Sequence, residues 1–181
     1  VGEGAELIRR GDADVVLAGG TESCMHPVIL AGFTAMRGLV AEEEDPTLAS
    51  RPFDATRAGF VMGEGSGALI LESIAHAKKR KARIYAEVAG YAATSEAYHM
   101  VIPREDGAEV ATTMRLALED AGLMPGVVDY INAHATSTAV GDAVEIKAER
   151  GVECERQPGR DCGRGRHPGA DRDVAAEGAV E

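Results

Sequence analysis

The stretch YINAHATSTAVGDAVE, residues 130–145, holds the residues whose types and spacing are best suited to chemistry. His134 directly follows a run typical of a β-strand, and open α/β sheets gather catalytic groups beyond the carboxyl ends of their strands. After Gly141 turns the chain, two acidic residues three positions apart share one face of the next helix. The polar residues after the histidine are Thr136, Ser137, Thr138, Asp142 and Glu145. The residues alone leave three hypotheses open: a catalytic histidine, a structural one, and a metal site formed by His134, Asp142 and Glu145.

A glycine-rich stretch, GEGSG at residues 63–67, is superficially similar to a phosphate-binding loop. Such loops lead into a helix N-terminus, whose free N–H groups face the anion. Here the apolar run ALILE follows and predicts a strand, and the spacing is not G-x-G-x-x-G. The stretch therefore favours a tight turn before a core strand over nucleotide binding.

The three cysteines form neither an even framework nor a C-x-x-C pair, which is typical of a reducing compartment. Cys24 lies near His26, yet a small buried thiol is the favoured interpretation over a nucleophile. The spacing of Cys154, Cys162 and His167 matches no standard zinc pattern. The cysteines therefore predict a cytoplasmic protein and give no support to a zinc site.

Composition argues against several classes of protein. The 181 residues carry a formal net charge of −11 with a pI near 4.9, which argues against binding to nucleic acid or to an anionic membrane. No apolar run approaches the roughly 20 residues of a transmembrane helix, so we expect no membrane insertion. The first residues also lack the pattern of a signal peptide. The length suits one domain or a piece of a larger one, and a start at Val1 suggests a fragment or a processed product.

Helical and strand patterns alternate as far as Glu149, which predicts an α/β fold with a largely covered sheet. Helices are expected at residues 5–11, 26–39, 74–82 and 106–123. Strands are expected at residues 15–17, 66–73, 83–93 and 128–133, and the second of these is apolar enough to be buried on both faces. In the fourth helix, the expected core stripe is Val110, Met114, Leu118 and Ala121, with Gly122 as the C-cap.

The character of the sequence changes abruptly at about Arg150. Residues 150–181 are crowded with Arg, Gly, Asp and Glu and show almost no apolar periodicity. Such a segment does not bury enough apolar surface to offset the entropy lost on ordering. We therefore expect disorder over residues 150–181, and an out-of-frame reading of a GC-rich gene is the sharper hypothesis for their origin.

Several stretches together resemble the β-ketoacyl-acyl carrier protein synthases, in particular the type II elongating enzymes. NAHATSTAVGDAVE is similar to the first-histidine motif of that family. GDADVVLAGGTES, RPFDATRAGFVMGEGSGALILE and SEAYHMVIPREDGA occur in the family's order, so the resemblance runs from Val1 to about Glu149. Ala135 stands where glycine is commoner and Ala139 where proline is usual, which affects local backbone shape but removes no chemical group.

This resemblance implies a thiolase-like layered fold (αβαβα), built from two similar halves and normally dimeric, of which only the middle portion is present. Residues 1–149 would hold the end of the first half and the start of the second. The implied reaction is a decarboxylative Claisen condensation in fatty acid elongation. An acyl group passes from acyl carrier protein to a cysteine, malonyl-carrier protein loses carbon dioxide, and the carbanion attacks the acyl thioester.

The resemblance also implies roles for residues of the His134 stretch. The histidine at this position would donate a hydrogen bond to the malonyl thioester oxygen as the enolate forms, and such preorganised donation is commonly the largest catalytic term. Asp142 and Glu145 match the acidic pair that supports this network. Thr136 and Thr138 would hold the phosphopantetheine arm.

Three further residues receive implied roles. Phe33 would line the acyl or malonyl pocket, and Arg37 would face the acidic carrier protein, since one basic residue is enough to steer an acidic partner. Asn132 resembles a ligand of the structural monovalent cation, Na⁺ or K⁺, seen in some members. No other cofactor is implied, because the carrier protein brings the phosphopantetheine.

The residues that work with the histidine in this family fall outside the matching stretch. The nucleophilic cysteine would precede Val1, while the second histidine, the lysine and the glycine-rich loop would follow Glu149. None of the three cysteines aligns with the nucleophile, so we expect a fragment that is inactive alone. The alternatives are a polyketide ketosynthase fragment and, from another class, a non-catalytic partner subunit resembling a chain-length factor.

Overall fold

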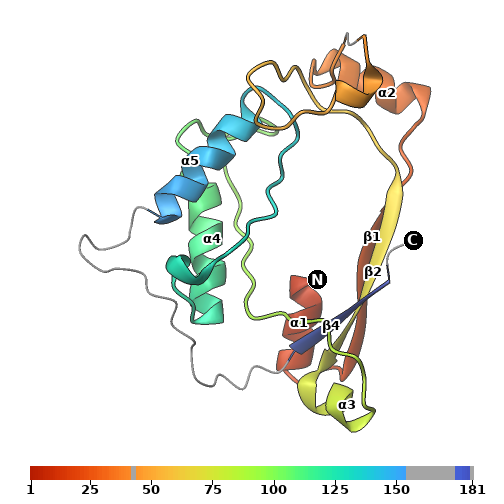
Figure 1. Ribbon diagram of the computed structural model, residues 1–181, viewed down its shortest axis with the longest axis vertical. Helices are drawn as coiled ribbons and strands as arrows, with labels where there is room; N and C mark the ends of the chain where they lie inside the picture. The colour runs from red at the N-terminus through yellow and green to blue at the C-terminus, as the bar shows by residue number, and fades with distance from the viewer. Residues whose placement is uncertain (42–43, 154–173, 180–181) are drawn as a thin grey trace.

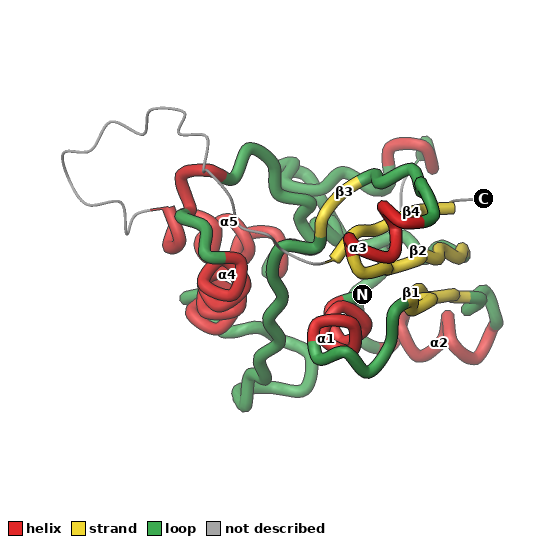
Figure 2. Tube along the Cα trace, turned by 90° about the horizontal axis from the view of Figure 1, so that it is seen from below, coloured by secondary structure: helices red, strands yellow, loops and turns green. Residues whose placement is uncertain are grey.

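The computed structural model of the chain describes residues 1–41, 44–153 and 174–179. A sheet and its helices lie on one side of the molecule, and a pair of helices, α4 and α5, lies on the other (Figure 1). Long segments without regular structure connect the two groups, as the view in Figure 2 also shows. No helix among these residues is long and apolar enough to cross a membrane.

The sheet has the strand order β1-β2-β4-β3, and every neighbouring pair is antiparallel. Its strands are β1 (Val15–Glu22), β2 (Gly65–Ser73), β3 (Ala86–Glu87) and β4 (Val174–Ala179). The long pair runs in register from Val15 opposite Glu72 to Glu22 opposite Gly65. Gly19 permits a close approach within this pair, because a Cβ there would come within 2.3 Å of the Gly67 carbonyl oxygen.

One face of the sheet is covered by helix α1 (Gly2–Arg9), as Figure 2 shows. Ala5 and Ile8 of the helix form a buried cluster with Leu71 of β2. The opposite face is open: Leu17 is 74% exposed and Ile70 is 40% exposed. The prediction of a largely covered sheet, with residues 66–73 buried on both faces, is therefore wrong for this chain. An apolar strand pattern requires two covering layers, and the described residues supply only one.

Two helices form the second group, α4 (Ala108–Ala121) and α5 (Gly141–Glu153). Their contact centres on a buried cluster of Ala111, Ala148 and Val152. The expected stripe is confirmed, because Val110, Met114 and Leu118 pack against this cluster and Ala121 is buried. Gly122 ends α4 at φ 61° as predicted, since a residue without a Cβ adopts the left-handed conformation easily.

The shorter elements also follow local rules. Helix α2 (Pro27–Ala35) begins with a proline, and the His26 ring accepts a hydrogen bond from the Val28 N–H. Helix α3 (Ile74–Lys79) is capped by Ser73, whose hydroxyl accepts from the His76 N–H. Short 3₁₀ turns occur at η1 (Pro46–Leu48) and η2 (Pro125–Val127).

Two predicted strands are largely or wholly absent. Of residues 83–93, only Ala86–Glu87 pair, and residues 128–133 before His134 form no strand. A strand exists only where a neighbouring strand accepts and donates its backbone hydrogen bonds. Tyr130 is 79% exposed and Ile131 is 42% exposed, so no second layer covers this segment either. The segment has the apolar pattern of a strand, but the described residues provide no neighbouring strand for it to pair with.

The boundary predicted at Arg150 also needs correction. Helix α5 continues to Glu153, because Val152 is buried against α4, and Val174–Ala179 pairs with β2 as strand β4. Disorder is therefore wrong for these two stretches, where packing and sheet pairing offset the ordering entropy. Residues 154–173 and 180–181, which carry the rest of that prediction together with Cys154, Cys162 and His167, lie outside the described residues.

A buried carboxylate, Glu72, ties β2 to α3. The Arg80 guanidinium donates to both of its oxygens, and His76 Nδ1 lies 2.8 Å from Oε2. The Arg80 hydrogen bond is the main cause that lowers the pKa of Glu72 to about 2, and His76 contributes in the same direction against the opposing effect of burial. The ionised form therefore stabilises the fold fully above pH 4.5, and this contribution is lost as the pH falls towards 2.

Replacing Glu72 with Gln is expected to lower the free energy of unfolding at pH 7 by about 1.5–3 kcal/mol, the usual contribution of a hydrogen bond to a charged group. The difference from the unsubstituted chain should shrink at pH 3, where the unfolded carboxyl is protonated. Urea denaturation at both pH values measures this. Asp12→Asn, which removes an exposed pair with Arg10, is the control and should change little. An equal deficit at both pH values contradicts the assignment of a charged Glu72.

Candidate active site

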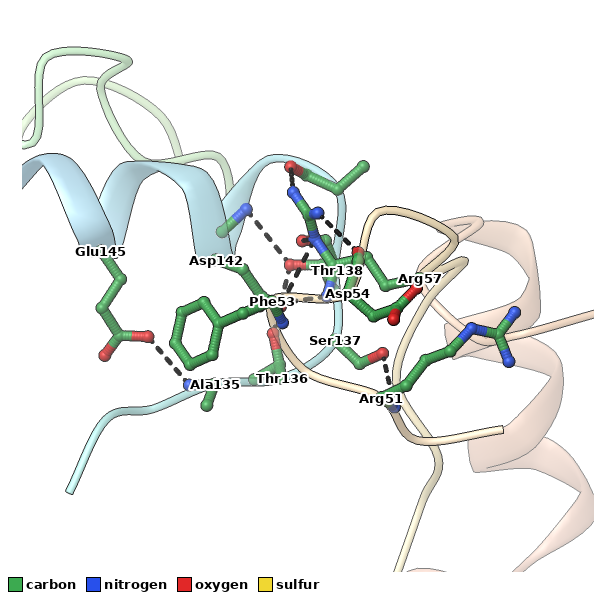
Figure 3. A network of polar contacts seen from close by, with 12 residues as sticks. Arg51, Phe53, Asp54, Arg57, Ala135, Thr136, Ser137, Thr138, Asp142 and Glu145 are labelled. Carbon is green, nitrogen blue, oxygen red and sulfur yellow. Dashed lines mark hydrogen bonds and ion pairs between the residues drawn. The ribbon is translucent and has the colours of Figure 1, made fainter. Parts of the chain in front are cut away.

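The residues predicted to do chemistry lie in and just after the turn before α5, beside a loop from an earlier part of the chain. Residues 134–140 have no helix or strand of their own, and α5 begins at Gly141 (Figure 3). The loop of residues 51–59 packs against this turn. The site is thus assembled from two segments about 80 residues apart in sequence.

Glu145 fixes the backbone at the histidine. Its carboxylate accepts the His134 N–H at 2.5 Å and the Ala135 N–H at 2.9 Å. The His134 side chain itself is exposed. Glu145 therefore binds the main chain of the turn, and these hydrogen bonds do not involve the imidazole.

Asp142, one helical turn earlier, is 1% exposed and holds both segments. Its Oδ2 accepts the Phe53 N–H at 2.8 Å, and its Oδ1 accepts the Thr138 N–H at 3.2 Å. The Arg57 Nε lies 3.4 Å from Oδ2, which makes an ion pair. This carboxylate is where the loop and the turn meet.

The contacts of these two carboxylates bear on the metal hypothesis. Asp142 and Glu145 project to the same turn, as their spacing predicts, but both bind backbone N–H groups. Within the part of the chain that the structure describes, no group of three or more His, Cys, Asp or Glu residues is arranged to hold a metal ion. The hypothesis of a site formed by His134, Asp142 and Glu145 is therefore wrong, because the carboxylate oxygens already have donors.

The three hydroxyl residues divide into two kinds. Ser137 is fully buried; its Oγ accepts the Arg51 N–H at 3.1 Å and its carbonyl accepts the Gly59 N–H at 3.0 Å. Thr136 and Thr138 are half-buried, with their Oγ1 atoms 3.1 Å apart. Ser137 is thus structural, whereas the two threonines keep part of their surface available for a ligand.

The turn has an unusual backbone, with φ 45° at Ala135 and φ 67° at Ser137. Residues with a Cβ rarely adopt this left-handed region, and each such residue costs roughly 1–2 kcal/mol. The departure from glycine noted at position 135 therefore falls on a position that does require positive φ. Contacts from α5 and from residues 51–59 hold the turn in this shape.

Sequence reasoning did not identify Arg57 as a site residue. Its guanidinium donates to the carbonyls of Thr138 at 2.9 Å and Ala139 at 2.6 Å. Its stretch, RPFDATRAG, was recognised only as part of the family resemblance. An arginine in a loop carries no periodic signal, so a partner 81 residues away was not predictable from spacing.

Phe33 lies in the last turn of α2 and Arg37 lies just after the helix ends; both are far from the His134 turn in sequence. Phe33 is half-buried and meets Phe60 edge to face, with ring centroids 5.4 Å apart. Phe60 follows Gly59, which bonds to the turn at Ser137. Arg37 is exposed with φ 55°. The structure thus brings Phe33 next to the site's supporting loop and leaves Arg37 at the surface.

Three other predicted features also have definite surroundings. Asn132 is exposed, and its Oδ1 accepts the Tyr130 hydroxyl at 3.3 Å. Cys24 is half-buried, and its thiol donates to the Gly63 carbonyl at 3.5 Å. The ring of His26 caps α2, so the described contacts give Cys24 no activating histidine, but the predicted buried thiol is only half-buried. Gly65 and Gly67 lie in β2, so GEGSG does lead into a strand, as predicted.

Comparison with solved structures identifies the fold class of this chain. A chain of a solved type II polyketide synthase complex, an acyl-carrier protein with its ketosynthase bound to the hexaketide, superposes with a TM-score of 0.83 at 45% identity. The match covers 85% of this chain and 38% of that one. The described residues therefore have part of the thiolase-like α/β fold of ketosynthases.

Sequence relatives and family models agree. The model of the β-ketoacyl synthase N-terminal domain matches residues 1–77, and that of the C-terminal domain matches residues 85–163. The chloroplastic 3-oxoacyl-[acyl-carrier-protein] synthase I of Hordeum vulgare is 51% identical over 148 residues, or 82% of this chain and 32% of that protein. The 3-oxoacyl-[acyl-carrier-protein] synthase 2 of Vibrio cholerae is 46% identical over 147 residues, or 81% and 36%.

This chain belongs to the β-ketoacyl synthase family. It spans about a third of the length of the curated relatives it matches. The match to the C-terminal domain reaches residue 163, beyond the boundary expected at Glu149.

Proposed function

We propose that the protein containing this chain is a 3-oxoacyl-acyl carrier protein synthase that elongates fatty acids. In the proposed reaction an acyl group moves from its carrier-protein thioester to an enzyme cysteine. Malonyl-carrier protein then loses carbon dioxide, and its α-carbon attacks the acyl thioester. A carbon–carbon bond forms, the bond to the cysteine sulfur breaks, and the cysteine leaves as thiolate.

The observation that carries this proposal is the His134 turn. His134 is exposed, and its backbone is held by Glu145, which accepts the N–H groups of His134 and Ala135. Decarboxylation places negative charge on the malonyl thioester oxygen, and a fixed donor aimed at that oxygen lowers the barrier without reorganising. We assign this donation to His134, and the binding of the phosphopantetheine arm to Thr136 and Thr138.

The proposed partner is acyl carrier protein. The chain carries a net charge of −11, so an acidic partner needs a local basic contact rather than a favourable overall charge. Arg37 is exposed at the end of α2, four residues after Phe33, which we place at the acyl or malonyl pocket. A carrier protein bound at Arg37 would lie beside Phe33, which contacts Phe60 next to the 51–59 loop.

A polyketide ketosynthase is the second candidate, favoured by the TM-score of 0.83 to the polyketide synthase complex. A partner subunit resembling a chain-length factor is the non-catalytic alternative. The residue in the turn that precedes α1 discriminates between these classes: cysteine favours an enzyme, and glutamine favours the partner subunit.

Three further expectations stay predictions: a homodimer, a cytoplasmic location and a monovalent cation at Asn132. The Asn132 amide oxygen is a suitable ligand type for Na⁺ or K⁺. It already accepts the Tyr130 hydroxyl, and since both residues are exposed, a cation would have to displace that hydroxyl.

A chimera tests the proposed function. Residues 1–149 of this chain replace the matching segment of the Hordeum vulgare synthase, which supplies the cysteine and the C-terminal residues. We expect the chimera to condense acyl- and malonyl-carrier protein. Mass spectrometry of the 3-oxoacyl product measures this condensation. A folded, dimeric chimera that takes up the acyl group but releases no carbon dioxide would refute the role proposed for the His134 turn.

The 181-residue polypeptide by itself is expected to give no condensation product. The reaction proceeds through a covalent acyl-cysteine intermediate, and the half-buried Cys24 has no activating partner among its described contacts. Incubation with labelled acyl-carrier protein, followed by intact-mass measurement, checks this, with the chimera as the positive control. A stable acyl adduct on Cys24 would contradict the assignment.

A further inference from the structure

We infer that Arg57 is a positioning residue that fixes the turn carrying His134. Its guanidinium reaches across from the 51–59 loop and donates to the Thr138 and Ala139 carbonyls at 2.9 Å and 2.6 Å (Figure 3). It also donates to its own loop, at the Asp54 carbonyl, at 2.9 Å. One side chain thus joins the two segments through three backbone acceptors.

The turn needs such a tie because no regular structure holds it. Residues 134–140 form neither helix nor strand, and Ala135 and Ser137 have positive φ. Backbone groups that have no partner in a helix or sheet must be satisfied by side chains or water. Apart from the Gly59 and Asp142 N–H groups, which donate to the Ser137 and Thr138 carbonyls, the turn is held by the side chains around it.

Those side chains are of two kinds, acceptors for the N–H groups of the turn and donors to its carbonyls. The carboxylates of α5 accept the N–H groups of the turn, with Glu145 binding His134 and Ala135, and Asp142 binding Thr138. Arg57 supplies the complement, because it donates to the carbonyls at the end of the same turn. Losing Arg57 removes the two side-chain hydrogen bonds to the Thr138 and Ala139 carbonyls, whereas the carboxylate acceptors of the N–H groups stay.

Arg57 also balances the buried Asp142. The two form an ion pair at 3.4 Å, with the arginine side chain 17% exposed and the aspartate side chain 1% exposed. A planar guanidinium donates in several fixed directions at once, whereas a lysine ammonium is a compact charge without that fork. Lysine should therefore keep the charge balance but lose part of the bridge between the two segments.

The inference rests on the proposed function only in naming the task for which His134 is positioned. Its test needs no catalysis. Backbone amide exchange is measured by NMR on the ¹⁵N-labelled 181-residue chain, so a failure here is distinguishable from a failure of the proposed reaction. The reporters are the amides of His134 and Ala135, which contact Glu145 and not Arg57.

Arg57→Met should speed exchange of these two amides at least tenfold, and Arg57→Lys should have an intermediate effect. Val152→Ala, which shortens a buried α5 side chain remote in sequence from the turn, controls for a general loss of stability. Arg104→Met, which removes an exposed pair with Asp106, controls for the loss of an arginine. Both controls should leave the two amides unchanged relative to the rest of the chain.

Three results would overturn the inference. In the first, the His134 and Ala135 amides stay equally protected in Arg57→Met; in the second, Val152→Ala exposes them as much. In the third, they exchange freely in the unsubstituted chain, which would show that the turn is not held at all. Should Arg57→Met fail to fold, Arg57→Lys decides, since it retains the charge beside Asp142, and unchanged protection there counts against the inference.

Discussion

Replacing His134 with Ala in the chimera is expected to slow decarboxylation of malonyl-carrier protein by about 10²–10³, which corresponds to roughly 2.7–4 kcal/mol of transition-state stabilisation. The substitution removes a donor without adding bulk, and the side chain is exposed. The Glu145 contacts are to backbone N–H groups, so they survive the change. The fold of the turn should therefore persist while the chemistry is lost.

The effect should fall on one half-reaction more than on the other. Transfer of the acyl group to the cysteine develops charge on a different oxygen, so it should slow much less. The two steps are measured separately, as acyl-enzyme formed and as carbon dioxide released. Equal slowing of both would indicate a distorted site, and unchanged carbon dioxide release would show that His134 is a structural histidine.

Asp142→Ala is expected to lower the free energy of unfolding of the chain by about 3–5 kcal/mol, the usual effect of removing one partner of a buried charge pair. The carboxylate is 1% exposed and has three partners: the N–H groups of Phe53 and Thr138, and Arg57. Alanine leaves the Phe53 and Thr138 N–H groups, which are partly buried, without their acceptor. The 51–59 loop and the His134 turn should separate.

Urea denaturation, followed by circular dichroism, measures this loss. Asp142→Asn is the matched variant, since its amide oxygen still accepts from one N–H, and its effect should be smaller. Glu145→Gln is the positional control on the same helix face; Glu145 is only half-buried, so its loss should cost less than that of Asp142. A deficit below about 1 kcal/mol for Asp142→Ala would mean that the loop and the turn are held by other contacts.

Local patterns in the sequence predicted the helices well. The stripe of Val110, Met114 and Leu118 placed α4, and Gly122 marked its end. Helix periodicity and capping act within a few residues, so the information lies in the stretch itself. The family resemblance was carried in the same way by contiguous motifs, and the family models confirm it.

The strands were predicted less well, because a strand depends on distant partners. Residues 128–133 have an apolar β-type pattern but pair with nothing described, and the open face at Leu17 lacks its second layer. Conversely, Val174–Ala179 has no convincing strand pattern yet pairs with β2. A local pattern can be compatible with a strand, but pairing and coverage of the strand depend on residues that are distant in sequence.

The candidate residues of the site are evident from local sequence: His134 after an apolar run, and Asp142 and Glu145 on one face of the following helix. Their contacts follow from the tertiary fold. It turned both carboxylates towards backbone N–H groups, which removes the metal hypothesis, and it brought Arg57 from 81 residues away to the turn's carbonyls. Residue type and helical spacing can be seen within a short stretch of sequence. The partner of a buried charge depends on which distant segments the fold brings together.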